Sequence, residues 1–557
     1  MHKFYAIIEG MKYIYILENE EKFRDEMIEA IRKIDPQLLV RYFSSLEEFS
    51  KWIKLVMLEG PEALPKGGTA PQGQLEPTGG THHLPLIISK DEFLGSHHMS
   101  LLRKTRDLFI KKGLCTQEEP TSLVLTSFDS PDFDIKLAED RIINNVIFKP
   151  FDKLMMQQHL AFAIGGRRPA SSYSVHNMKT TATIEMLKEV EVEAMSDVGF
   201  ISLSNRPIKP GALAKYYSQT FVSLRHRSMM ALCLSCEPHP DRKDYFRCAF
   251  TYLAADTFQI SNIRKQVRQK DLKAFEFQWA RASQTSVAGQ PPAVEIALIS
   301  ADEHLTSYFK ETIEKNFNNA IVHHFTNLQD FLYTVDPALA KKDKKEIDFK
   351  KMPQIQKTLH AVVADQFLFE GNFKERWQTI LDTVKEKYPD PNTRSGKTDV
   401  FAVAKRPYSD PEERAMGEVV KDIFFQPVDP MYLSKKLMVF IPALSPKEEI
   451  HTVTVHLQQV AKAASPIEIN EFSEAGLVFK YYRPISTGAF REFVLWLPHE
   501  LDTPVFLATC NYTEESKAEK GVYFNHFVFF GTNDHYLKHI RRWILQNHVH
   551  SKESESA

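Results

Sequence analysis

The chain has 557 residues, which suggests about four domains, and its 43% hydrophobic and 25% charged residues are the ordinary balance of a soluble globular protein. The net charge is −2 and basic residues are spread along the chain, so no overall field points toward nucleic acid or an anionic membrane, and we expect no nucleic-acid partner. No stretch approaches the roughly 18 apolar residues that span a bilayer, and Glu9 and Lys12 argue against a signal peptide. Because five scattered cysteines fit a reducing compartment, we expect a cytoplasmic protein.

The first region, residues 11–165, alternates apolar strands with amphipathic helices. The segment IYILENEEKFRDEMIEAI, from Ile14, reads as a strand, a polar turn and a helix, and LPLII and SLVLT read as later strands. This βαβ pattern predicts a parallel, doubly wound sheet. Residues 175–283 change to alternating strands such as EVEVEAMSDVGFISLS, which predict an antiparallel β-barrel, followed by one long amphipathic helix over about 256–282.

The second half of the chain repeats the first. VIFKPFDKLMMQQHLAFAI, from Val146, matches IFFQPVDPMYLSKKLMVFI, from Ile423, and MSDVGF and RPIKPGA match FSEAGL and RPISTGA. The spacing between copies is 277 residues at all three matches, which indicates a tandem duplication. We therefore expect a second α/β domain over 293–442, a second barrel over 449–548, and a disordered tail over 549–557.

Polar residues follow the strands of the first α/β domain, at the sheet edge where doubly wound folds bind ligands. Glu18 and Asn19 follow the first strand, Asp91 the third, Thr126 the fourth and Lys149 the fifth. Carboxylates suit Mg²⁺, and an ammonium group would neutralise a phosphoryl group. The pattern therefore indicates a magnesium and phosphoryl site.

This constellation resembles the response-regulator receiver family, in which acidic residues follow strand one, Asp follows strand three, Thr or Ser follows strand four, and Lys-Pro follows strand five. The resemblance implies that Asp91 is phosphorylated and that Glu18 and Asp91 hold Mg²⁺. It also implies that Thr126 and Lys149 contact the phosphoryl group. The run SKD, which ends at Asp91, leaves the register of the phosphoacceptor open by a residue or two.

The second α/β domain has lost most of this pattern. Ser300 and Ala301 stand at the acidic positions, Ala404 at the Thr position and Gln426 at the Lys position, so Asp365 alone remains as a weak phosphoacceptor candidate. Without a carboxylate cluster there is no Mg²⁺ site, and we expect a pseudo-receiver. The alternative for the first copy is a receiver fold that serves as a protein-binding scaffold.

The motifs SDVG, at Ser196, and SEAG, at Ser473, each lead into an apolar strand and a Pro…Gly turn. They resemble the PilZ family, small β-barrels that in many members bind cyclic di-GMP. The resemblance implies nucleotide contacts from Ser196, Gly199, Glu471, Ser473 and Gly476, with Arg167 and Arg168 before the first barrel as a phosphate clamp. The arginines are adjacent rather than three residues apart, and Ala194 holds the family's acidic position in the first copy. The alternative is a barrel that contacts proteins.

Cys233 and Cys236 have the spacing of zinc ligands, but they lie on a predicted strand, where residues three apart point to opposite faces. We therefore expect core packing rather than zinc. The sequence contains no nucleophile motif and no Gly-rich phosphate loop, so we expect no enzyme.

The expected fold is multidomain α/β plus all-β: two flavodoxin-like receiver domains, each followed by a PilZ-like antiparallel β-barrel with a C-terminal helix. The resemblances imply a bacterial intracellular signal-transduction protein without catalytic activity, whose partners are a histidine kinase or a downstream effector. It would respond to phosphorylation of the first receiver, to cyclic di-GMP, or to both. The alternative is a constitutive interaction scaffold that binds neither phosphate nor nucleotide.

Overall fold

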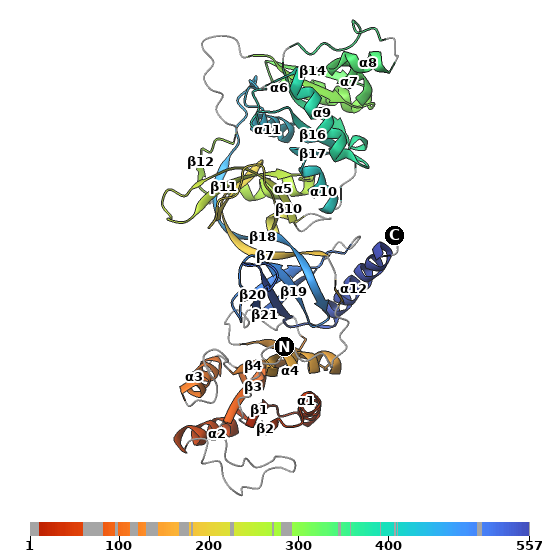
Figure 1. Ribbon diagram of the computed structural model, residues 1–557. Coiled ribbons are helices and arrows are strands. Elements are labelled where there is room, and N and C mark those ends of the chain that lie inside the picture. The colour runs from red at the N-terminus through yellow and green to blue at the C-terminus, as the bar shows by residue number, and fades with distance from the viewer. Residues whose placement is uncertain are drawn as a thin grey trace. The chain divides into compact units, whose positions relative to one another are not determined.

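Two long strands divide the chain into two units. The computed structural model describes residues 11–59, 82–94, 98–111, 121–129, 143–165, 178–179, 182–222, 228–269, 272–279, 292–343, 347–356, 358–389, 391–405, 408, 410–497 and 504–555. Unit 1 comprises Met1–Leu187 and Pro466–Ala557, and unit 2 comprises Lys188–Ser465. The chain passes between them within β7 (Thr183–Ser196) and within β18 (Thr454–Ser473) (Figure 1). Each unit therefore combines the α/β region of one half of the chain with the β region of the other half.

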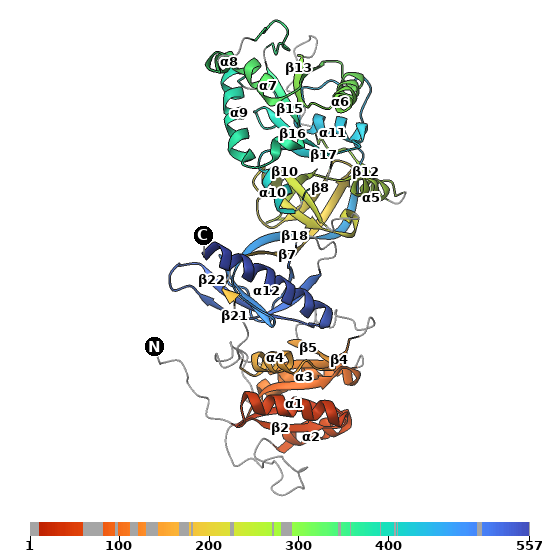
Figure 2. The ribbon, with the colours of Figure 1, turned by 90° about the vertical axis from the view of Figure 1, so that its right-hand side faces the viewer.

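Unit 1 contains a five-stranded parallel sheet of order β2-β1-β3-β4-β5. Its elements are β1 (Met11–Leu17), α1 (Glu21–Ile34), β2 (Leu39–Phe43), α2 (Leu46–Glu59), β3 (His82–Lys90), η2 (Asp91–Leu94), α3 (His98–Lys111), β4 (Ser122–Phe128), β5 (Asn145–Lys149) and α4 (Lys153–Gly165). Helices cover both faces: Ile88 packs in a cluster with α1 and α4, the face that Figure 2 views, and Leu125 packs in another with α2 and α3, on the opposite side in Figure 1. The central strands carry apolar residues on both faces, such as Ile87 and Ile88 of β3, because helices cover both sides of the sheet.

Unit 2 contains a second parallel sheet with the same winding, of order β14-β13-β15-β16-β17. Its elements are β13 (Val294–Ile299), α6 (Glu303–Asn316), β14 (Ala320–Phe325), α7 (Leu328–Val335), α8 (Pro337–Lys342), β15 (Leu359–Asp365), η5 (Gln366–Phe369), α9 (Phe373–Lys387), β16 (Asp399–Ala404), α10 (Asp410–Gly417), β17 (Asp422–Phe425) and α11 (Pro430–Phe440). The order 2-1-3-4-5 is that of flavodoxin-like sheets, which is compatible with receiver-like domains.

Each unit also contains antiparallel strands. In unit 1 the strand order is β18-β19-β22-β21-β20-β7, and β6 also pairs with β18. The further elements of this region are β6 (Met178–Lys179), β19 (Gly476–Tyr481), β20 (Phe490–Val494), β21 (Val505–Glu515), β22 (Tyr523–Phe529) and the helix α12 (Asp534–Glu555). In unit 2 the strand order is β7-β8-β11-β10-β9-β18, and β12 also pairs with β18. The further elements of this region are β8 (Gly199–Ser204), β9 (Leu213–Tyr217), η4 (Gln219–Phe221), β10 (Ser228–Pro238), β11 (Phe246–Leu253), the helix α5 (Thr257–Val267) and β12 (Ala274–Phe275). The helix packs on the strands in each unit, as Trp543 of α12 does on Phe472 at a ring-centroid distance of 4.5 Å.

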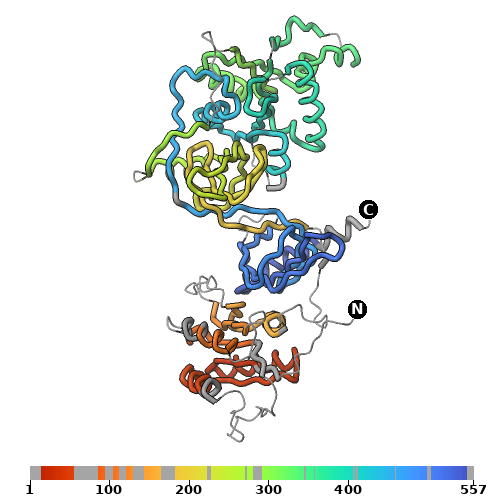
Figure 3. The backbone as a smooth tube through the Cα atoms, turned by 60° about the vertical axis from the view of Figure 1, so that its left-hand side comes forward, coloured from red at the N-terminus to blue at the C-terminus, as the bar shows by residue number. Residues whose placement is uncertain are grey.

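The strands β7 and β18, gold and light blue in Figure 3, make equivalent pairings in the two β regions. The beginning of β7 pairs with β20, where Glu185 lies opposite Val494. The beginning of β18 pairs with β9, where Lys462 lies opposite Tyr217. These two pairings are equivalent, because each residue lies 277 positions from its counterpart. Each β region therefore includes the start of a strand whose remainder belongs to the other.

The helices that follow the two β regions differ from the sequence expectation. The prediction of one long helix over 256–282 is wrong, because α5 ends at Val267 and Trp279 is not helical. Phe275, Phe277 and Trp279 alternate with the period of a strand, and β12 pairs with β18. In the second copy, α12 continues to Glu555 and includes most of the expected tail. No helix within the described ranges is both long and apolar enough to cross a membrane.

Candidate functional site

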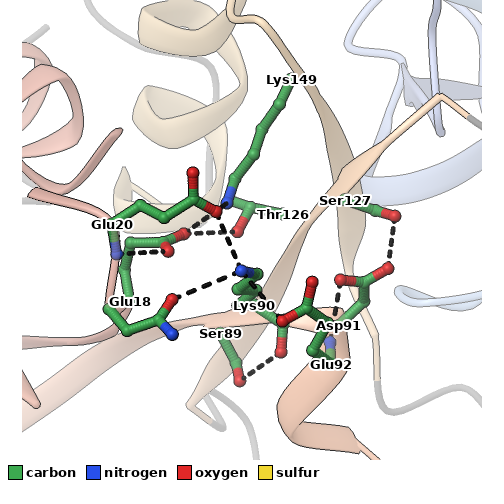
Figure 4. Close-up of polar contacts among 10 residues, drawn as sticks. Glu18, Glu20, Ser89, Lys90, Asp91, Glu92, Thr126, Ser127 and Lys149 are labelled. Carbon is green, nitrogen blue, oxygen red and sulfur yellow. Dashed lines mark hydrogen bonds and ion pairs between the residues drawn. The ribbon is translucent and has the colours of Figure 1, made fainter. Parts of the chain in front are cut away.

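A buried ion pair joins the carboxyl ends of β1 and β5 in unit 1 (Figure 4). Lys149 Nζ lies 2.6 Å from Glu18 Oε2, and neither side chain is exposed. Thr126 donates a hydrogen bond of 3.5 Å to the same oxygen, and the backbone N–H of Glu20 donates to Glu18 Oε1 at 3.1 Å. The structure therefore brings together three of the predicted site residues: Glu18, Thr126 and Lys149.

A second lysine, which the sequence analysis did not select, lies beside this pair. Lys90 is 5% exposed, and its Nζ is 2.9 Å from a carboxylate oxygen of Glu20 and 2.9 Å from one of Glu92. It also donates to Asn19 Oδ1 at 3.3 Å. Burial alone would lower the pKa of Lys90, but the hydrogen bonds to the two glutamates outweigh burial and raise it. The hydrogen bond from Lys90 likewise lowers the pKa of Glu20. The site therefore already contains two fixed cations.

Asp91, the predicted phosphoacceptor, is the first residue of η2 and has partners of its own (Figure 4). Ser127 Oγ donates to Asp91 Oδ2 at 2.5 Å, and the backbone N–H of Glu92 donates to Oδ1 at 2.8 Å. These contacts are those of a residue that holds the turn after β3. The Asp91 carboxylate therefore accepts its side-chain hydrogen bond from Ser127, whereas Lys149 is bonded to Glu18.

The strand registers identify Lys90 as the counterpart of Asp365. Leu17, the last residue of β1, pairs with Ser89, while Ile299, the last residue of β13, pairs with Ala364. The residue after each partner is Lys90 in unit 1 and Asp365 in unit 2. In the next strand, Lys90 pairs with Thr126 and Asp365 pairs with Val403, so Val403 is the counterpart of Thr126. Ala404, which we expected at the position of Thr126, is the counterpart of Ser127. Aligning LPLIISK with LHAVVAD in the sequence would have revealed the lysine.

Asp365, the acid that unit 2 keeps at this position, is hydrogen-bonded to a hydroxyl group, and the Lys405–Asp302 ion pair lies close enough to interact with it electrostatically. Asp365 is buried, and its Oδ2 accepts a hydrogen bond of 2.6 Å from Ser300 Oγ. Ser300 occupies the position of Glu18, and Gln426 that of Lys149. The buried Glu18–Lys149 ion pair of unit 1 is thus replaced by Ser300 and Gln426, and Ser300 makes a hydroxyl–carboxylate hydrogen bond with Asp365.

Mg²⁺ fits these residues poorly. The cation requires carboxylates that are open to it and to water, whereas Glu18 is already paired with Lys149, and Glu20 and Glu92 with Lys90. Asp91, the other predicted ligand, is engaged by Ser127. Within the described ranges, no three His, Cys, Asp or Glu side chains are grouped as metal ligands.

The serine and glycine of each SxxG motif form the same turn in both β regions. Ser196 Oγ accepts from the backbone N–H of Gly199 at 3.2 Å and donates to its carbonyl at 3.1 Å. Ser473 makes the equivalent bonds with Gly476, both at 3.2 Å. A Cβ on either glycine would lie 2.1 Å from a carbonyl oxygen of the neighbouring strand, so only glycine fits. The motif therefore has a structural function in both copies.

The space beside this turn differs between the copies. In unit 2, a Cβ on Gly199 would lie 2.6 Å from the ring of Trp279, a buried side chain that donates to Thr454 Oγ1 at 2.9 Å. In unit 1, a hollow of about 40 Å³ lies beside the turn. Its walls include Phe162, Glu471, Ser473, Gly476, Asn511 and Tyr512. Arg167 and Arg168, the predicted phosphate clamp, lie outside the described residues.

An arginine bridges the α/β and β regions within each unit. In unit 1, Arg541 lies 3.0 Å from Glu474, in the SxxG turn, and 3.6 Å from Asp152, which follows β5. In unit 2, Arg264 lies 3.8 Å from Asp197 and 2.6 Å from Asp429. All three members of one bridge lie 277 positions from those of the other. The repeat predicts that the two bridges are equivalent, but it does not predict which α/β region each bridge connects to which β region.

The comparisons with known proteins leave the family open. No protein-family model matches the chain, and no curated protein matches it. Two similar solved structures are a pilus assembly protein from Burkholderia thailandensis (12% identity, 26% of this chain and 94% of that one, TM-score 0.17) and a pilus assembly-related protein from Burkholderia pseudomallei (12%, 28% and 95%, 0.18). Another is a two-component system response regulator/GGDEF domain protein (8%, 76% and 96%, 0.18). Because these TM-scores are low, the receiver-like fold rests on the sheet order described above.

Proposed function

We propose that the chain is a phosphorylation-independent signalling adaptor, in which two receiver-like domains and two PilZ-like β regions, arranged in tandem, bind other signalling proteins. The observation that carries this proposal is that Lys90 occupies the position of Asp365. An ammonium group stands where the receiver mechanism needs a carboxylate.

The electrostatics of unit 1 support the same function. A phosphorylated receiver gains negative charge, which Mg²⁺ and the lysine that follows strand five in the family balance. Here Lys149 is paired with Glu18 at full burial, and Lys90 is paired with Glu20 and Glu92. Breaking a buried ion pair costs about 3–5 kcal/mol. A phosphoryl group could engage either lysine only by breaking these buried pairs.

Beryllofluoride with Mg²⁺ tests the proposal, since this complex mimics an acyl phosphate. We expect calorimetry of the full chain to detect no Mg²⁺-dependent beryllofluoride binding. Lys90→Asp restores an acid at the position of Asp365, and we expect this variant to gain Mg²⁺ affinity. Mg²⁺-dependent binding to the unmodified chain that is lost in Asp91→Asn would overturn the proposal.

Cyclic di-GMP sensing by the second β region is the second candidate function. It is favoured by the hollow beside Gly476, whose walls include Glu471 and Ser473. At about 40 Å³ the hollow is small beside the roughly 300–1,000 Å³ of ordinary ligand pockets, so side chains would have to move. Calorimetry with cyclic di-GMP decides: saturable binding that Glu471→Ala weakens supports this candidate, and absence of heat removes it.

A further inference from the structure

Two thiols lie in contact on neighbouring strands of unit 2. Cys236, on β10, pairs directly with Cys248, on β11, and their Sγ atoms are 2.9 Å apart. Directly opposite residues on antiparallel strands have Cα atoms roughly 4.5–5.5 Å apart, within the range that a disulfide bond bridges. Shortening the sulfur–sulfur distance by about 0.9 Å would reach the bond length. No disulfide bond joins the two cysteines in the structure.

A β-bulge brings a third cysteine to the same side. The register of β10 and β11 shifts between Cys233 and Ser235. The expectation that Cys233 and Cys236 point to opposite faces of a regular strand is therefore wrong. Both contact Ile208: its backbone N–H donates to Cys236 Sγ at 3.2 Å, and its carbonyl accepts from Cys233 Sγ at 3.8 Å. These contacts hold the turn before β9.

The matched position in unit 1 holds its turn without a thiol pair. Thr513 and Asn525 lie 277 positions after Cys236 and Cys248, and Thr513 Oγ1 donates to Asn525 Oδ1 at 2.9 Å. Asn525 Oδ1 also accepts from the backbone N–H of Ile485 at 2.9 Å. Because a hydroxyl and an amide make stronger hydrogen bonds than thiols, the fold itself does not require cysteines here.

We propose that Cys236 and Cys248 form a reversible disulfide bond when the protein meets a peroxide. The Cys236 thiol loses its proton and the thiolate attacks a peroxide oxygen, so that an S–O bond forms and the O–O bond breaks, and the departing hydroxide takes up that proton and leaves as water. The Cys248 sulfur then attacks the sulfenic acid, the S–S bond forms, and the hydroxyl leaves as water with the Cys248 proton. Two thiols are oxidised by two electrons, and one hydrogen peroxide is reduced to two waters.

The order of these steps follows from exposure. Cys236 is partly exposed, whereas Cys248 and Cys233 are buried. Burial raises the pKa of Cys233 to about 12 and raises that of Cys248 as well, and the hydrogen bond between Cys236 and Cys248 adds to the rise for Cys248. A buried thiol reacts slowly with a soluble oxidant, so Cys236 reacts first and Cys248 resolves it. Oxidation also weakens the acceptor of the Ile208 N–H, which loosens the turn.

Mass spectrometry of the full chain tests this proposal. The protein is treated with hydrogen peroxide, alkylated under denaturing conditions and digested without reductant. We expect a linked Cys236–Cys248 peptide that has lost two hydrogens and returns to two alkylated peptides after dithiothreitol, while Cys233 and Cys510 stay alkylated throughout. If both Cys236 and Cys248 remain alkylated after peroxide, or if the links join other cysteines, the proposal is wrong.

Two sets of variants separate the chemistry from packing. In Cys248→Ser, the sulfenic acid on Cys236 has no resolving thiol, so we expect dimedone to label Cys236; absence of label contradicts the order of the steps. Thr513→Cys combined with Asn525→Cys places a thiol pair at the matched position of unit 1. We expect this pair to form the same reversible bond, since the paired strands supply the geometry.

Discussion

Asn145, in the first α/β region, donates a hydrogen bond of 3.1 Å to the backbone carbonyl of Phe529, in the β region of the other half of the chain. Its counterpart 277 positions later, Asp422, accepts a hydrogen bond of 2.9 Å from the backbone N–H of Ala254, in the β region of the first half. The two halves therefore exchange partners, and each unit is completed by both. The second member of each polar pair differs, since Asn145 contacts His159 and Asp422 contacts Lys436.

Asn145→Ala removes the polar link within unit 1. The side chain donates to Phe529 and His159 and accepts from the backbone N–H of Gly531 at 3.2 Å, all at buried atoms. We expect the free energy of unfolding of unit 1 to fall by about 2–3 kcal/mol, because buried groups lose their partners. Hydrogen exchange measured by mass spectrometry reports this loss for β5 and β22. Lys538→Ala, at an exposed position of α12, is the control, and equal effects of both variants would contradict the expectation.

Lys436→Met tests the charged pair of unit 2. Lys436 Nζ lies 3.0 Å from Asp422, donates to Thr251 Oγ1 at 2.6 Å and to the carbonyl of Tyr252, and is not exposed. Burial lowers the pKa of Lys436 and raises that of Asp422, and each is partly offset by the other. We expect a loss of about 3–5 kcal/mol in the unfolding free energy of unit 2, because the partner acid stays buried.

Copying the polar pair of unit 1 into unit 2 supplies the matched control. In Asp422→Asn with Lys436→His, a neutral pair replaces the charged one. We expect this double variant to recover a large part of the stability lost in Lys436→Met, as measured by denaturant unfolding. A double variant no more stable than Lys436→Met would show that the two units do not use these positions equivalently.

The sequence predicts the parts of this fold better than their pairing. Apolar runs predict both parallel sheets, and the 277-residue spacing predicts the equivalence of the copies. The pairing of regions depends on buried contacts such as Asn145 with Phe529, hundreds of positions apart, and the apolar faces of the two copies are too alike to distinguish. Glu18, Thr126 and Lys149 lie together as predicted, whereas Lys90 was missed for a local reason: SKD is polar throughout, so the pattern does not show that β3 continues to Lys90.

The stability of unit 1 should depend on pH through His159. Burial lowers the pKa of this imidazole from 6.5 to about 4, and its Nδ1 accepts from Asn145 Nδ2 at 2.7 Å. Between these values the unfolded chain binds the proton more readily, so stability is complete above pH 6.5 and falls as the pH drops toward 4. The loss is about 2 kcal/mol at pH 5. Urea unfolding of the full chain at pH 7.5 and pH 5 measures it, and His159→Met should remove this part of the pH dependence.

Asp399, at the start of β16 in unit 2, should give a pH dependence of the opposite sign. Burial raises its pKa from 3.8 to about 7, against the opposing effects of Lys421 and the hydrogen bond from Ser395. Its Oδ2 has no hydrogen-bond partner within the described part of the chain. The folded chain therefore binds the proton more readily between pH 3.8 and 7, and stability falls as the pH rises through that window.

Asp399→Asn keeps the shape of the protonated acid and removes its charge. We expect the variant to be more stable than the unmodified chain at pH 8 by up to about 4 kcal/mol, the free energy that corresponds to the shift in pKa. At pH 4 the two proteins should differ little, because the acid is then protonated in the fold. Glu386→Gln, at an exposed position of α9, controls for loss of a carboxylate. Equal stability of Asp399→Asn and the unmodified chain at pH 8, measured by urea unfolding, would show that Asp399 is ionised in the fold at little cost.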